Sequence, residues 1–289
     1  MTRDLVRTPA IDRRTRRRFQ LSHYWEKGSR CFLYVWSAAG ILFLLTPILL
    51  TIPLSLSNST SLTFPPTGFS LQWYENFFTD PSWVSALRTS AILALSSSLF
   101  ALVLGAFASY SLVRGAFKGR KQIRANLLAP IMLPEIIIAV SLYFVFSAIG
   151  LTGHFIGLVV AHTILILPFV VLLLTVAIQS VDVRIEHAAI TLGASRFGML
   201  RKVLMPILVP SVLVAWVFTF IVSFDNVVIS LFLGGTYITL PKKMFLGLNS
   251  GFDPTIAAVA TLLIALSIVT AGAIALVLRR FSSLSKMFF

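Results

Sequence analysis

Long apolar runs without charge dominate this chain, in place of the alternating or 3.6-residue patterns that mark half-buried strands and surface helices. Asp, Glu, Lys and Arg are absent from five stretches, residues 31–74, 89–113, 136–181, 203–224 and 254–278. A helix needs about 20 consecutive apolar residues to cross a bilayer. The pattern therefore predicts an all-α, polytopic membrane protein.

The number of membrane spans follows from the lengths of these stretches. The stretch 136–181 is long enough for most of two helices, and the turn sequence Gly150-Leu151-Thr152-Gly153 divides it. Six transmembrane helices are therefore predicted, at residues 32–54, 86–112, 126–149, 154–178, 207–232 and 255–278.

Composition and charge give these spans an orientation. Hydrophobic residues make up 57% of the chain and charged residues only 12%, whereas soluble proteins carry about 25% charged residues. Most of the Lys and Arg residues, 21 of 24, fall in the segments 1–30, 113–125, 179–206 and 279–289. With six spans these four segments share one side of the membrane, which the positive-inside rule makes the cytoplasmic side. Both termini are therefore predicted to be cytoplasmic.

The same pattern divides the chain into three parts. Residues 1–30 form a basic cytoplasmic arm whose charge favours partial disorder, residues 31–282 form a single six-helix membrane domain, and residues 283–289 form a cytoplasmic tail. The run from Arg13 to Arg18 could bind nucleic acid. In a chain with six spans we favour a topology signal that touches anionic membrane lipid, and we expect no nucleic-acid partner.

Catalytic signatures are missing from the sequence. It contains no G-x-x-x-x-G-K-[ST], G-x-S-x-G or H-E-x-x-H motif. His154 and His162 are eight residues apart, which on a helix is about 12 Å and too far for the two to share one metal ion unaided. We therefore expect no enzyme activity, no metal site and no cofactor in this chain.

The cytoplasmic segment 179–206 carries a recognisable pattern. It is rich in helix-forming residues and has no proline before Pro206, which predicts a helix–turn–helix that projects from the membrane. Glu186-His187-Ala188-Ala189 is followed by Gly193 and, nine residues later, by Val203-Leu204-Met205-Pro206. This spacing resembles the EAA loop of permease subunits of binding-protein-dependent ATP-binding-cassette importers, where Glu-Ala-Ala, three residues, Gly and nine residues precede Ile-x-Leu-Pro.

The loop departs from the family pattern at the acid. His187 stands where the family has Glu, so the identity of the anchoring acid stays open, with Glu186 adjacent. Small side chains would let such a loop enter a cleft of an ATPase, Gly193 permits a sharp turn, and Pro206 suits the start of the next span. The expected coupling residues are Glu186, His187, Ala188, Ala189, Gly193, Ala194, Met205 and Pro206.

The resemblance implies a type I importer permease fold in a bacterial inner membrane, together with a set of partners. A second and different permease subunit would complete the pore, two ATPase subunits would bind ATP and Mg²⁺, and an extracytoplasmic solute-binding protein would deliver the solute. Further segments are similar to permeases for polyamines and related compounds, namely residues 69–74, 223–230, 239–244 and 253–258.

Two carboxylates fall inside predicted spans, Glu135 and Asp225, and intramembrane acids commonly face a water-filled or protein-lined interior. Helix rise puts Glu135 near the midplane and Asp225 near the outer mouth, and Pro134 should loosen the helix beside Glu135. Carboxylates near aromatic faces suit a cationic amine, and acids at two depths suit an elongated one. The predicted substrate path includes Glu135, Tyr143, Phe218, Asp225 and Asn226.

Several alternatives stay open. Each acid could be structural, hydrogen-bonded to Ser, Asn or the backbone. The solute could be an opine, another amino-acid derivative or a sugar. The chain could also be an ATP-independent secondary transporter or a channel of six helices, although its halves show no convincing repeat of broken helices.

Overall fold

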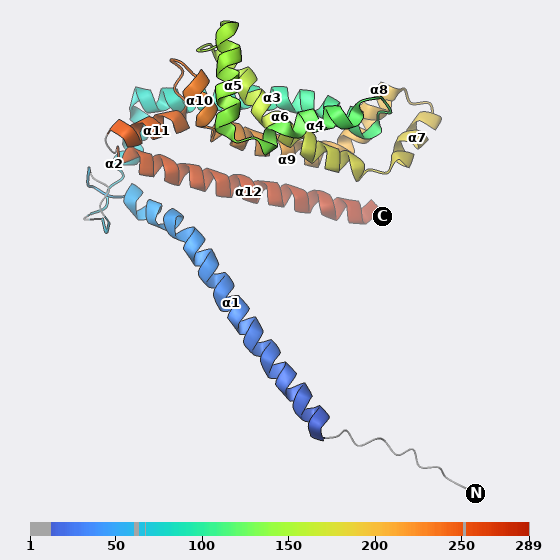
Figure 1. Cartoon of the computed structure of the whole chain (residues 1–289), viewed down its shortest axis with the longest axis horizontal. Helices are drawn as coiled ribbons and strands as arrows, with labels where there is room; N and C mark the ends of the chain where they lie inside the picture. Colours follow the sequence, from blue (N-terminus) through green and yellow to red (C-terminus); the bar gives the residue numbers. More distant parts are fainter. Residues whose placement is uncertain (1–12, 61–63, 67, 251–252, 289) are drawn as a thin grey trace. The chain divides into compact units, whose positions relative to one another are not determined.

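Helices make up nearly all of the regular structure in the computed structural model, which describes residues 13–60, 64–66, 68–250 and 253–288. Within these ranges the only strand-like pairing is an isolated bridge between Ser57 and Phe69. The elements in Figure 1 are α1 (Arg13–Ser55), α2 (Gln72–Thr79), α3 (Pro81–Arg114), α4 (Arg120–Met132), α5 (Glu135–Ala148), α6 (Phe155–Gln179), α7 (Val183–Thr191), α8 (Arg196–Met199), the π-helix η1 (Leu200–Leu204), α9 (Met205–Phe224), α10 (Val228–Leu233), α11 (Leu240–Ser250) and α12 (Thr255–Phe288).

The chain forms two compact units, Met1–Pro53 and Leu54–Phe289. Helix α1 supplies the described part of the first unit and already begins at Arg13, so residues 13–30 of the expected basic arm are helical. Its segment Phe32–Ser55 is long and apolar enough to cross a membrane.

Most of the predicted spans correspond to long apolar helices in the described part of the chain. Five segments are long and apolar enough to cross a membrane, namely Phe32–Ser55, Pro81–Arg114, Phe155–Gln179, Arg196–Phe224 and Thr255–Ile274. A sixth span exists only if α4 and α5 together count as one. The predictions for the first, second, fourth and sixth spans are therefore confirmed as helices of sufficient length.

The third predicted span, 126–149, is wrong as a continuous helix. It is two helices, α4 and α5, bent by 110° at residues 133–134, and Figure 1 shows α5 crossing its neighbours. The break follows from Pro134, since the residue before a proline is pushed out of the helical region. Leu133 accordingly has extended backbone, with φ −95° and ψ 140°. Pro134 therefore breaks this segment completely, which is more than the expected loosening.

The fifth predicted span, 207–232, is wrong at its C-terminal end. At its start it continues the helix of the 179–206 segment, because residues 196–224 are helical without a gap, and a π-helical turn at Leu200–Leu204 precedes Pro206. A proline ring clashes with the carbonyl four residues back in an α-helix, and Lys202, four residues before Pro206, lies in this wider turn. The helix ends at Phe224, and α10 follows after three residues.

The centre of the second unit is built on α3, α6 and α9, which enclose an apolar cluster that includes Leu93, Leu158, Ile166 and Ala215. Close packing of α3 on α6 uses small residues four apart, Ser97, Ala101, Gly105 and Ser109, all buried. A Cβ on Gly105 would lie 2.5 Å from a methyl of Val170 in α6. The two helices therefore approach as closely as a glycine allows.

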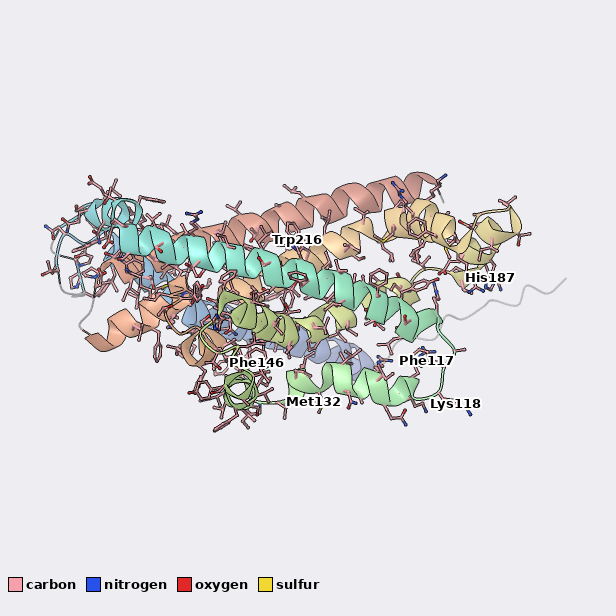
Figure 2. All side chains as sticks on the ribbon, turned by 90° about the horizontal axis from the view of Figure 1, so that it is seen from above. Phe117, Lys118, Met132, Phe146, His187 and Trp216 are labelled. Carbon is pink, nitrogen blue, oxygen red and sulfur yellow. The ribbon has the colours of Figure 1, made fainter. Side chains whose placement is uncertain are left out.

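Three basic segments of the second unit lie at one end of it. Figure 1 places α7, α8 and the C-terminal end of α12 there, and Figure 2 shows Phe117, Lys118 and His187 at the same end. The predicted turn between α5 and α6 is confirmed by left-handed Gly150 and Gly153, at φ 71° and 78°. The grouping agrees with the sidedness that the charge pattern predicts.

Candidate functional site

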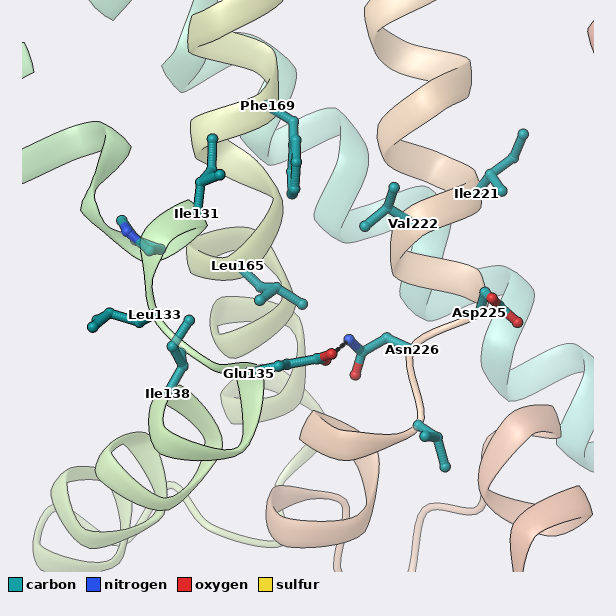
Figure 3. A pocket seen from close by; sticks show the side chains of 12 residues that line it. Ile131, Leu133, Glu135, Ile138, Leu165, Phe169, Ile221, Val222, Asp225 and Asn226 are labelled. Atoms are coloured by element: carbon teal, nitrogen blue, oxygen red, sulfur yellow. Dashed lines mark hydrogen bonds between the residues drawn. The ribbon is translucent and has the colours of Figure 1, made fainter.

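A cavity of about 420 Å³ opens between helices of the second unit (Figure 3). Its lining is mainly apolar and contains two acids, one amide and no basic side chain. The lining residues are Pro130, Ile131, Leu133, Glu135, Ile138, Leu165, Phe169, Ile221, Val222, Asp225, Asn226 and Val227.

Both helix breaks contribute to this cavity. Residues 130–138 bring the end of α4, the bend at Pro134 and the start of α5, while residues 221–227 bring the end of α9 and the turn before α10. Irregular backbone at membrane depth is tolerated where it is covered by protein or lines a cavity. The breaks that the span predictions missed are therefore the features that form this site.

Glu135 is the first residue of α5, where the partial positive charge of the helix N-terminus favours a carboxylate. Asn226 comes from the other break, 91 residues away, and its side-chain Nδ2 donates a hydrogen bond to Glu135 Oε1. Figure 3 shows these two side chains pointing toward one another. Because the partner of Glu135 is a neutral amide, the negative charge of its carboxylate is not neutralised by this contact.

Asn226 has a second task. It is only 8% exposed, and its Oδ1 accepts a hydrogen bond from the backbone N–H of Ile229 at 3.0 Å. A side-chain oxygen that accepts an N–H of the first turn caps a helix. Asn226 thus accepts from the first turn of α10 through Oδ1 and donates to Glu135 through Nδ2.

Asp225 is the C-cap residue that follows α9, and it lines the same cavity. The broken spans thus bring Glu135 and Asp225, which the sequence placed at two depths, to the lining of one cavity. The Asp225 carboxylate points away from the Glu135–Asn226 pair (Figure 3) and is exposed. It lies at a helix C-terminus, which carries partial negative charge and adds to the attraction for a cation.

Phe169 is the aromatic residue that lines the cavity. Phe218, which the sequence suggested, packs against the Phe169 ring edge-to-face at 5.7 Å and is not among the lining residues. Tyr143 is also absent from the lining and contacts Phe144 instead. Only the helical position of Phe169, four residues after Leu165 in α6, could have indicated it.

The segment 179–206, the predicted coupling segment, has the expected helix–turn–helix form. Asp182 accepts a hydrogen bond from Arg184 N at 2.9 Å to cap α7, and Ser195 accepts one from Gly198 N at 3.1 Å to cap α8. Between the two helices Gly193 has φ 92°, a left-handed conformation that favours glycine.

Glu186 is turned into the second unit. It is 4% exposed, and the Nε of Arg114, the last residue of α3, lies 2.7 Å from its Oε1. The same guanidinium donates to the carbonyls of Ile178 at 3.1 Å and Val181 at 2.8 Å. Arg114, which the sequence marked only as a basic residue of the loop, therefore joins α3, the end of α6 and α7.

The other residues predicted to take part in coupling divide into a packed set and an exposed set. Ala189 and Ala194 pack against a cluster of Ile178, Val181, Met199, Leu204 and Leu208. His187, Ala188, Gly193, Met205 and Pro206 are exposed. Large apolar side chains flank the turn on the outside, with Leu192 88% and Phe197 71% exposed.

Comparison with known families decides what kind of protein carries this arrangement. A family model described as "Binding-protein-dependent transport system inner membrane component" matches residues 101–283. The chain belongs to this family. It is the permease subunit of an ATP-binding-cassette importer.

Several relatives of this permease are permease proteins of named transport systems. It is 34% identical over 238 residues to the spermidine/putrescine transport system permease protein PotC of Escherichia coli (strain K12), covering 82% of this chain and 90% of the relative. Identity to the putrescine transport system permease protein PotI of the same strain is 30%, with coverages of 78% and 83%. The trehalose transport system permease protein SugB of Mycobacterium tuberculosis is 28% identical, with coverages of 79% and 86%.

Solved structures show the same fold. A chain of a bacterial transporter that imports the acidic polysaccharide alginate has a TM-score of 0.62 at 15% identity, covering 95% of the permease and 99% of that chain. A chain of the inward-facing MetNI methionine transporter has a TM-score of 0.58 at 20% identity, covering 70% and 98%. Within the residues described for the permease, no three His, Cys, Asp or Glu side chains group as metal ligands.

Proposed function

We propose that the permease passes a polyamine or related small amine through the cavity between its two helix breaks. The observation that carries this proposal is the Glu135 carboxylate, which lies in a mainly apolar cavity with a neutral amide partner and no basic side chain in the lining. The ring of Phe169 adds an aromatic surface suited to an ammonium group, and Asp225 adds a second acid at the edge of the same cavity. Relatives named for spermidine and putrescine support the same solute class.

The proposed topology has six spans, with the bent pair α4 and α5 counted as one, and both termini in the cytoplasm. The grouping of basic segments at the end that carries α7 supports this orientation. In this arrangement the coupling segment faces the cytoplasm and the cavity lies within the membrane.

The proposed partners are those of the importer class. Two ATPase subunits, which hold ATP and Mg²⁺, would dock on the turn between α7 and α8, where exposed Leu192 and Phe197 offer apolar anchors. A second, different permease subunit would close the cavity on its open side, and an extracytoplasmic binding protein would supply the solute.

Glu135→Gln in the complete importer tests the solute path. Loss of a charge-assisted contact worth about 1.5–3 kcal/mol should lower spermidine and putrescine uptake roughly tenfold or more. The amide keeps the size of the side chain, so the amount of assembled complex should stay the same. Glu75→Gln, an exposed acid in α2, is the matched control.

Uptake of radiolabelled spermidine, putrescine and trehalose is then compared at equal amounts of complex. Amine uptake that survives Glu135→Gln unchanged would overturn the proposed path. Trehalose uptake in place of amine uptake would assign the permease to sugars. Uptake that continues after the ATPase subunits are removed would favour a secondary carrier.

A further inference from the structure

A fully buried histidine lies between the two helices that flank the second break. His162 in α6 has no exposed surface. Its Nδ1 is 2.9 Å from Ser223 Oγ, and its Nε2 is 3.3 Å from Ser230 Oγ. Both ring nitrogens therefore have a hydrogen-bonding partner, as a buried imidazole requires.

The two serines belong to different helices. Ser223 is in the last turn of α9, and Ser230 is in α10, so the backbone between them runs through the break at residues 225–227. One imidazole ring thus joins the helix ends that this break separates. The ring holds the break from the side of α6, and both of its hydrogen-bonding partners are uncharged hydroxyls.

The neighbouring hydroxyls give the hydrogen bonds a consistent direction. Ser97 donates to the Leu93 carbonyl at 2.8 Å, so in its 2.8 Å contact with Ser223 it is the acceptor. Ser223 then donates its hydroxyl proton to Ser97 Oγ and accepts a hydrogen bond from His162 Nδ1–H. In the neutral ring this leaves Nε2 as an acceptor, and the single proton of the Ser230 hydroxyl is shared between Nε2 and the carbonyl oxygen of Asn226, each 3.3 Å away. An apolar side chain cannot replace either bond.

The same network reaches the cavity. The Ser230 hydroxyl is also 3.3 Å from the carbonyl oxygen of Asn226, and Asn226 in turn caps α10 through Ile229 and donates to Glu135. A shift of α10 relative to α9 would therefore turn Asn226 and change the contact that Glu135 makes. Buried hydrogen-bond networks of this kind fix one arrangement when every member is satisfied.

We propose that His162 is a positioning residue of the solute cavity: by bridging α9 and α10 it holds the break at residues 225–227 and so aims Asn226 at Glu135. The ring itself does not line the cavity, so its effect on the solute passes through Asn226. This inference rests on the proposed role of the cavity in solute passage.

The test measures binding at the cavity directly, in the complete importer complex. Val227 lines the cavity, and the sequence has a single cysteine, Cys31. In a Cys31→Ser background, Val227→Cys is labelled with a water-soluble thiol reagent, and the spermidine concentration that protects half of the thiol is determined. His162→Leu should raise this concentration about tenfold, as expected for the loss of about one well-formed hydrogen bond.

Two further variants separate positioning from general loss of structure. His162→Gln supplies a side-chain amide, which can both donate and accept a hydrogen bond as the imidazole does. It should return the half-protecting concentration to within roughly threefold of the parent protein. Thr219→Val is the matched control, because Thr219 is equally buried but donates to Ala215 within its own helix. It should leave both labelling and protection unchanged.

The outcomes keep the two proposals apart. If Glu135→Gln impairs amine uptake but His162→Leu changes neither the protection by spermidine nor the labelling rate, the positioning role is overturned. If Glu135→Gln leaves uptake unchanged, the solute path itself fails, whatever His162→Leu does. Failure of His162→Gln to improve on His162→Leu would also count against positioning, since a packing role alone would not need the polar atoms.

Discussion

Glu135 and Glu186 are both held among the helices of the second unit, but they meet opposite kinds of neighbour. Glu135 faces the neutral amide of Asn226 at the wall of an open cavity. Glu186 is 4% exposed and paired with the guanidinium of Arg114. The charge of the first is left available to a ligand, whereas the charge of the second is neutralised within the protein.

The two neighbours give the two carboxylates different capabilities: Glu135 can attract a cation, whereas Glu186 connects helices. A carboxylate in a cavity with no basic lining residue can attract a cation that enters. A carboxylate bound to Arg114 instead links α7 to α3, and the same guanidinium holds the end of α6. The predictions below test this contrast.

Arg114→Ala should have the largest effect. Removing one partner of a buried ion pair costs about 3–5 kcal/mol because the other charge is left unpaired. The segment 179–206 should become sensitive to limited proteolysis, and ATP-driven uptake should be lost. Arg184→Ala, an exposed arginine of α7, should change neither measurement.

A double variant sharpens this prediction. Arg114→Met combined with Glu186→Met replaces both charges by apolar side chains of similar length, which is often close to neutral for stability. Protease resistance should therefore recover relative to Arg114→Ala. No recovery would show that the guanidinium's bonds to the carbonyls of Ile178 and Val181 matter more than its pairing with Glu186.

Leu192→Asp should disturb the coupling end without loosening the permease. Leu192 is 88% exposed, so the permease itself should change in stability by less than about 0.5 kcal/mol. Loss of an apolar anchor at an interface centre costs about 2 kcal/mol or more, and ATPase recovered with the purified permease should fall accordingly. Leu192→Met keeps an apolar side chain and should retain the ATPase.

Phe169→Leu should have a smaller effect, confined to the cavity. A cation–π contact contributes about 0.5–2 kcal/mol, so spermidine uptake should fall while ATPase recovery stays constant. Phe218→Leu removes the ring behind Phe169 and is the matched control. An equal loss in both variants would mean that aromatic packing, and not contact with the solute, is what matters.

Asp182→Ala should have the smallest effect. It removes the side chain that caps α7 through Arg184 N, and such a loss costs about 1 kcal/mol. Amide hydrogen exchange in the first turn of α7 should quicken by roughly fivefold. Asp182→Asn preserves a capping oxygen and should exchange at nearly the original rate.

The parts of the fold that follow from local composition were predictable from the sequence. Span length depends only on a run of apolar residues, so the helices over Phe32–Ser55 and Phe155–Gln179 match the predicted 32–54 and 154–178 closely. The turn at Gly150 and Gly153 was equally local, since both residues adopt positive φ. The helix–turn–helix form of 179–206 was predictable for the same reason.

The two breaks were not predictable from hydropathy. Leu133 is as apolar as a span interior, and only the geometry imposed by Pro134 turns the chain by 110°. The second break has no proline at all, and α10 is apolar like the helix before it. Its marker is Asn226, whose capping bond is visible only once α10 exists.

Contacts between distant segments were also beyond the sequence. Glu135 and Asn226 are 91 residues apart, and Arg114 and Glu186 are 72 apart. Each acid could be singled out by type and position, but its partner is set by how α3, α6 and α9 pack. The same acid type therefore occurs once in the lining of a cavity and once in an internal ion pair, which composition alone could not tell apart.

The close crossing of α3 and α6 limits how this permease can change shape. A single added Cβ at Gly105 would collide with Val170, and Ser109 Oγ donates to the Val171 carbonyl at 3.2 Å. Neither helix can roll over the other without first separating. Any motion that preserves this crossing therefore moves α3 and α6 together as one rigid body. Arg114 holds α7 against the end of this helix pair, whereas the bend at Pro134 separates α4 from α5.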